Sequence, residues 1–174
     1  MRVVNVHQRL LHASPERVSE LLASLGSPGD RLWPRNGWPR MSLDGPVAPG
    51  AAGGHGPIRY RVESWEPGRM VRFRFHRMRG VEGWHAFEIL DATAHHCVLE
   101  HRMEATLTGR MALKWAFAIR PLHDACVEDV LSQAQASLGE TPRAMPRTLR
   151  VQLLLRWLSR VEHRRAGGRP HPST

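Results

Sequence analysis

Three histidines occupy positions from which their side chains could do chemistry. His85 and His101 fall in the apolar phase of alternating segments, and His123, followed by Asp124, lies at the edge of an apolar helical stripe. Imidazole exchanges protons near neutral pH and binds metals. Three imidazoles beside one cavity could act as acid–base groups, anchor a ligand or hold zinc, or they could be ordinary buried histidines with hydrogen-bond partners.

Other chemistry is not indicated by the motifs of the sequence. Three histidines would suit zinc, but the pattern places no carboxylate on the same covered face to orient them. We therefore expect no metal and no other cofactor. The sequence contains no nucleophile elbow, phosphate loop, CxxC or HExxH motif, which argues against serine hydrolysis and phosphoryl transfer.

The segments that would position His85 and His101 are four strands. Residues 58–65, 70–76, 83–90 and 96–107 alternate apolar and polar residues, and Glu66-Pro67-Gly68-Arg69 has the form of a type II turn. The turn lengths predict an antiparallel meander with these facing pairs: Trp65 with Met70, Val62 with Phe73, Tyr60 with Phe75, Phe75 with His85, and His85 with His101.

One face of this meander is apolar and must be covered. A helical pattern from Met111 to Leu138 would cover it, with a kink or break just before Pro121, because proline lacks a backbone donor. Between the two we expect a ligand cavity. Its expected lining is Tyr60, Val62, Phe73, Phe75, Phe87, Leu99 and Met103 from the strands, Trp115 and Ile119 from the helix, and Trp38 from a loop that either forms the mouth or plugs the core.

The rest of the chain divides into recognisable parts. A first strand is expected over 3–11, a helix begins at Pro15, and the glycine-rich stretch 46–56 is expected to be a loop. These complete a domain of residues 1–138, followed by a linker (139–146), a basic amphipathic helix (147–165) and a disordered tail (166–174). Because arginines surround much of that helix, we favour docking on the domain or pairing in a homodimer over contact with an anionic membrane.

Composition bears on partners and location. The formal net charge is +9, but Lys114 is the only lysine and many arginines alternate with glutamates, as on a solvated face. Without a nucleic-acid motif, we expect no nucleic-acid partner. Cys97 and Cys126 make no disulfide framework, no apolar run approaches a membrane span, and no signal peptide is visible, so a cytoplasmic location is expected.

The order of strand, short helix, meander and long helix resembles the SRPBCC superfamily, close to bacterial polyketide cyclase/dehydrase-type proteins. The segments that carry the resemblance are Gly56-Pro-Ile-Arg-Tyr-Arg-Val, Trp65-Glu-Pro-Gly-Arg-Met-Val-Arg-Phe, Gly83-Trp-His-Ala-Phe-Glu-Ile and Arg120-Pro-Leu-His-Asp-Ala. It implies an α+β helix-grip fold, a curved antiparallel sheet wrapped around a long helix, and a hydrophobic cavity. The expected function is binding of a lipid, polyketide or similar molecule. The alternative is a polyketide cyclase or dehydratase using His85, His101 and His123 for acid–base catalysis, so enzymatic activity stays open.

Overall fold

The computed structural model describes residues 1–143 and 145–166. Its first part contains β1 (Arg2–Leu11), α1 (Pro15–Ala23), β2 (Met41–Leu43), β3 (Ala52–His55), β4 (Ile58–Glu66), β5 (Met70–Phe75), β6 (Val81–Leu90) and β7 (Cys97–Leu107). Its second part contains α2 (Arg110–Lys114), the π-helical segment η1 (Trp115–Ile119), α3 (Arg120–Ser137) and α4 (Leu149–Ala166).

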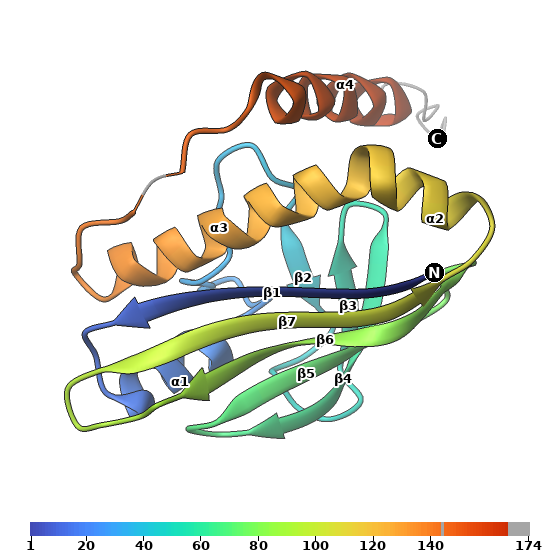
Figure 1. Ribbon diagram of the computed structural model, residues 1–174. Coiled ribbons are helices and arrows are strands. Elements are labelled where there is room, and N and C mark those ends of the chain that lie inside the picture. Colours follow the sequence, from blue (N-terminus) through green and yellow to red (C-terminus); the bar gives the residue numbers. More distant parts are fainter. Residues whose placement is uncertain (144, 167–174) are drawn as a thin grey trace, which may run out of the picture.

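The strands form one seven-stranded antiparallel sheet in the order β1-β7-β6-β5-β4-β3-β2. Figure 1 shows the curved sheet with α2 and α3 running across it, and α4 on the side of α3 that faces away from the sheet. Helix α1 closes one end of the curve, where its buried Leu21 and Leu22 join the core cluster that contains Leu131 of α3. This is the expected α+β helix-grip architecture.

Strand pairing agrees with the expected faces but only partly with the expected register. Between β4 and β5, Val62 faces Phe73 as expected, and Gly68 adopts the positive φ of +78° that a type II turn requires. An irregularity between Val62 and Ser64 then shifts the pairing by one, so Trp65 faces Val71 rather than Met70.

In the next two hairpins the expected register is wrong by two residues. His85 faces Phe73 on β5 instead of Phe75, and it faces Met103 on β7 instead of His101. The β5–β6 turn is two residues shorter, and the β6–β7 turn two residues longer, than the expected pairing required. A two-residue slip leaves every side chain on its own face, because side chains alternate with period two, so the expected apolar face persists.

The expectation of a loop over 46–56 is wrong in its second half. Residues 52–55 form β3, which pairs with β2 and β4. A Cβ at Gly53 would lie 1.9 Å from the Ser42 carbonyl oxygen, and one at Gly54 would lie 1.9 Å from that of Ile58. The glycines therefore permit close backbone approach rather than a loose loop, a role that composition alone does not distinguish.

The long helix deviates where Pro121 predicted a break. Helices α2 and α3 are joined without interruption by η1, which ends two residues before the proline. Pro121 cannot donate to the carbonyl of Phe117 four residues earlier, and the Arg150 guanidinium of α4 donates to that oxygen instead. The lost helical bond is thus replaced by a bond from the C-terminal helix.

Helix α4 docks on the domain in this single chain. Val151 is buried, and Arg147 just before the helix forms an ion pair of 2.6 Å with Asp129 of α3. Leu149, Leu153 and Trp157 stay more than half exposed. The expected disorder of 166–174 lies, from residue 167 on, outside the described residues. Among the helices of the described residues, none has the length and apolar character to cross a membrane.

Candidate functional site

Strand β1 directs polar side chains, rather than apolar ones, toward the interior. Its inward face carries Asn5, His7 and Arg9 between Val3 and Leu11. Its outward face carries the exposed apolar residues Val4, Val6 and Leu10. Apolar residues outside and polar residues beneath a covering helix contradict the usual pattern, and such violations concentrate at functional sites.

Aromatic rings continue this polar row across the sheet. From His7 the ring centroids step 6.5 Å to His123 of α3, 5.3 Å to His101 of β7, 5.5 Å to His85 of β6 and 5.0 Å to Tyr60 of β4. We call these five residues the histidine belt. It runs beneath the long helix from the β1 edge of the sheet to its middle.

The belt lies between two apolar clusters of the core. On β7, Leu99 belongs to the larger cluster and Met103 to the smaller one, with His101 between them. Phe73 of the larger cluster stacks on His85 at 5.0 Å, and Phe75 beside the smaller cluster lies 5.3 Å from the same ring. Along its length the interior therefore consists of an apolar cluster, the polar belt and a second apolar cluster.

Three of the belt imidazoles, those of His85, His101 and His123, have buried, unpaired nitrogens. His85 and His101 are 9% and 3% exposed, and both nitrogens of His85 and Nδ1 of His101 and of His123 have no partner among the described residues. Burial lowers the pKa of His85 to about 3 and that of His101 well below its ordinary value, because an imidazolium loses its hydration there. Burial likewise lowers the pKa of His123. These rings are neutral at physiological pH.

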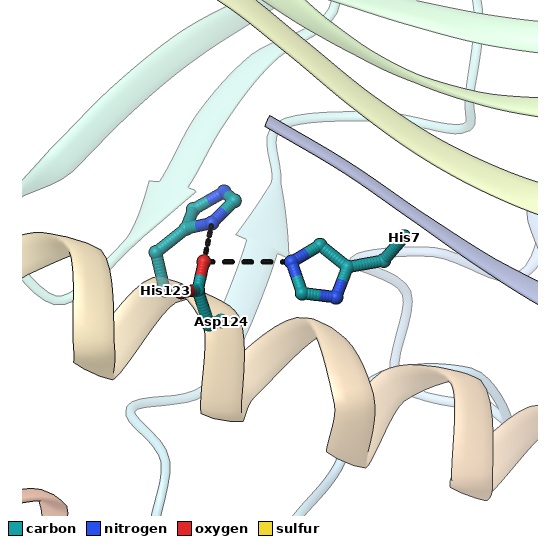
Figure 2. A group of neighbouring side chains, drawn as sticks. All are labelled: His7, His123 and Asp124. Atoms are coloured by element: carbon teal, nitrogen blue, oxygen red, sulfur yellow. Dashed lines mark hydrogen bonds and ion pairs between the residues drawn. The ribbon is translucent and has the colours of Figure 1, made fainter. Parts of the chain in front are cut away.

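At the β1 edge the belt meets a carboxylate (Figure 2). The Asp124 Oδ1 atom lies 3.4 Å from His7 Nε2 and 3.8 Å from His123 Nδ1, and it accepts a 2.8 Å hydrogen bond from Asn5 Nδ2. The 3.8 Å separation is too long for a hydrogen bond. Burial raises the pKa of Asp124, but the facing polar groups outweigh it and leave that pKa below the ordinary value.

The other nitrogen of His7 is held by a second carboxylate. His7 Nδ1 lies 2.8 Å from Glu128 Oε1, and Arg9 Nη2 donates to Glu128 Oε2 at 2.6 Å. Arg9 also donates to Gln135 of α3. A carboxylate can only accept, so Nδ1 of His7 carries the hydrogen of this bond. The pKa of His7 is raised, first by Asp124 and then, against burial, by Glu128.

The three expected chemical residues, His85, His101 and His123, come together in the belt, although His85 and His101 are not direct cross-strand partners. The expected lining residues divide between the apolar clusters: Tyr60, Val62, Phe73, Phe87 and Leu99 lie in the larger one, Met103 and Trp115 lie in the smaller one, and Phe75 and Ile119 pack against the smaller one. Trp38 lies apart. Its Nε1 donates to Asp129 on α3, and Arg147 lies over its ring.

Sequence reasoning missed His7, Asn5, Asp124 as a central group, and Glu128. Two patterns could have indicated them. Residues 5, 7 and 9 alternate as polar positions along one strand face, and Asp124 and Glu128 are four residues apart on one face of a helix. Their meeting depends on the β1–α3 contact, which no local pattern specifies.

Two hollows among the described residues lie outside the space between the belt and the long helix. One, of about 320 Å³, is lined by the loop that contains Trp33 and Trp38. The other, of about 280 Å³, lies at the β2–β3 hairpin beside His55. Trp38, which we expected to line the interior cavity, borders the first of these outer hollows.

No family model matches the chain, and no curated protein matches it. Solved structures do. Norcoclaurine synthase from Thalictrum flavum, in complex with a transition-state analogue, is 12% identical, with a TM-score of 0.59 over 80% of this chain and 96% of that one. A Thermobifida fusca protein is 12% identical, with a TM-score of 0.61 over 82% and 99%. The protein XoxI from Bacillus cereus is 16% identical, with a TM-score of 0.56 over 78% and 95%. At these identities the likeness shows the fold: this chain has the helix-grip architecture that those proteins share.

Proposed function

We propose that this protein binds a small, largely apolar organic molecule between the inward face of the sheet and the long helix, with the histidine belt as its polar anchor. One observation carries the proposal: both ring nitrogens of His85 are buried without a partner, and Nδ1 of the neighbouring His101 adds one more. Buried polar atoms are nearly always paired in folded proteins. A ligand with polar groups at this level would pair them.

The chemistry of the surroundings suggests the kind of molecule. A neutral imidazole offers one donor and one acceptor, so the belt suits hydroxyl, carbonyl or phenol groups. The clusters around Phe73 on one side and Trp115 on the other suit an apolar body. Each nitrogen that gains a partner would contribute about 1–3 kcal/mol, the cost of leaving such a group unpaired. A lipid or polyketide-like molecule meets this description.

Binding inside requires the interior to open, and the segment around η1 is the part best suited to move. The π-helical turn interrupts regular hydrogen bonding, and Leu113 and Phe117 beside it are 63% and 68% exposed. The smaller cluster beneath it has few buried members. Movement of α2 and η1 away from Met103 would open this end while α3 stays packed.

Native mass spectrometry of the purified chain, before and after solvent extraction, tests the proposal. We expect a bound small molecule that rebinds after extraction. Met103→Trp would place a larger ring where movement of η1 would open the interior, and it should reduce binding, whereas Val6→Trp adds the same ring to the outer sheet face and serves as the control. If the extracted protein binds no member of a panel of fatty acids and aromatic polyketides, or if both variants bind as the parent does, the proposal fails.

A second candidate is acid–base catalysis on a polyketide-like substrate, as in a cyclase or dehydratase. It is favoured by the convergence of three imidazoles, those of His85, His101 and His123, each with its ring centroid within 5.5 Å of the next along the belt, since histidine is the commonest proton-transfer group. Norcoclaurine synthase from Thalictrum flavum, a protein of this fold, has also been solved in complex with dopamine and hydroxybenzaldehyde. That structure is 13% identical to this chain, with a TM-score of 0.57 over 82% of this chain and 90% of that one. A polyketide synthase gene cluster around the gene would support this candidate. Normal turnover of an identified substrate by the His85→Ala, His101→Ala double variant would contradict it.

A further inference from the structure

We infer that His7, His123 and Asp124 form a binding site for one divalent transition-metal ion, which sequence reasoning did not anticipate. The three residues converge from β1 and α3, and one ligand atom from each lies within 4.8 Å of the others. Figure 2 shows both imidazoles directed at the carboxylate. The inference goes beyond the proposed function and does not depend on it, because it concerns the β1 edge of the belt and needs no organic ligand.

The first argument is the hydrogen-bond pattern of His7. Its Nδ1–H is donated to Glu128, and its Nε2 is directed at Asp124 Oδ1 at 3.4 Å, so a metal ion would take the place of the proton that Nε2 shares with this oxygen. Nδ1 of His123 is buried without a hydrogen bond and lies 3.8 Å from the same oxygen. Two nitrogens and a carboxylate oxygen thus converge, and Asn5 also donates a hydrogen bond of 2.8 Å to that oxygen. A cation between these atoms would stabilise all three.

The second argument is the distance between the atoms. Ligand atoms around a four-coordinate zinc ion, with bonds of about 2.0–2.2 Å, lie roughly 3.3–3.6 Å apart. The separation between His7 and Asp124 already falls in that range, and that between His123 and Asp124 exceeds it by a few tenths of an ångström. The nitrogens of His7 and His123 lie within 4.8 Å of each other, so metal binding would also have to draw these two rings closer together.

The third argument is the support around the ligands. Metal-binding histidines usually donate their second ring N–H to a carboxylate, which fixes the ring and raises its basicity. Glu128 does this for His7, and Arg9 holds Glu128 in place through a 2.6 Å ion pair. The Asp124 side chain is 36% exposed, which provides an entry path for an ion from solvent.

The donor set indicates the class of metal. Two imidazoles and one carboxylate suit zinc and neighbouring first-row divalent ions rather than calcium or magnesium, which prefer oxygen. Three protein ligands leave at least one position open. His123 is also a member of the belt, 5.3 Å from His101 in ring centroids, so the site adjoins the interior.

The test uses the full chain, stripped of metal with a chelator and titrated with Zn²⁺ in competition with a chromophoric chelator, and with Co²⁺ for its absorption spectrum. We expect one ion per chain and a higher melting temperature with Zn²⁺. Asp124→Asn and His7→Gln should each abolish the stoichiometric site, and Glu128→Gln should weaken it about 10–100-fold, as removal of an outer partner does. His95→Gln changes an exposed histidine of the β6–β7 turn and should bind as the parent does.

Two outcomes would overturn the inference. One is the absence of stoichiometric binding by the folded parent chain, which would mean that a proton rather than a metal separates His7 from Asp124. The other is equal affinity in the parent, Asp124→Asn and His7→Gln, which would assign the ion to surface histidines. Circular dichroism confirms that each variant is folded. Because the titration contains only metal, its failure leaves the proposal of an organic ligand standing.

Discussion

Acid should destabilise this protein through its buried imidazoles, and His85→Leu isolates the contribution of one of them. Leucine is close in volume to histidine and needs no hydrogen bond, so it fits between Phe73 and Met103. The pKa of His85 is lowered to about 3 from an ordinary value of 6.5. Below pH 6.5 the unfolded chain therefore binds a proton that the folded chain does not.

The sign and size follow from this difference. Stability is greatest above pH 6.5 and falls as the pH drops from 6.5 toward 3, by up to about 1.4 kcal/mol per pH unit for each such group. At pH 5 His85 alone costs about 2 kcal/mol relative to pH 8. His55, whose pKa burial also lowers to about 3, adds a similar loss, and the raised pKa of His7 acts in the opposite direction. Both terms are common to the parent and His85→Leu and cancel in the comparison.

Urea unfolding at pH 8, 7, 6 and 5 measures the effect. We expect the unfolding free energy of His85→Leu to exceed that of the parent at pH 8 by about 1–3 kcal/mol, because two unpaired nitrogens are removed. The excess should grow by about 2 kcal/mol at pH 5. His95→Leu, the same change in an exposed turn, provides the control. A difference between parent and variant that does not change with pH would refute the assignment of His85 as a buried neutral ring.

Two further changes should destabilise the fold itself. Gly83→Ala should lower the unfolding free energy, measured by chemical denaturation, by at least about 2 kcal/mol. Its φ is +152°, and the added Cβ would lie 2.1 Å from a β7 carbonyl oxygen. Gly45→Ala, where nothing lies near the added Cβ, should be nearly neutral. Arg9→Met should cost about 3 kcal/mol by leaving Glu128 without its cation, while Arg61→Met on the exposed face should have little effect; equal losses would contradict the role of the buried ion pair.

The faces of the meander could be predicted from the sequence because alternation is a local property. Val62, Phe73 and Phe87 follow the period of two, and any pairing that slips by an even number of residues keeps them on the same side. Pro67-Gly68 specified its turn, since only glycine adopts the required positive φ without strain. Pro121 likewise predicted an irregularity in the long helix, because proline itself lacks the backbone N–H that a regular helix needs.

Tertiary structure decided the register and the site. The β1 end of the belt exists because β1 turns His7 inward together with Asn5 and Arg9, while its valines at positions 4 and 6 face outward. These three polar side chains bind partners on α3 more than one hundred residues later. Nothing near residue 7 indicates that Asp124 and Glu128 will lie above it. Local propensity can place a histidine on a strand face, but the carboxylates that give that histidine a chemical role are brought to it only when the helix packs across the sheet.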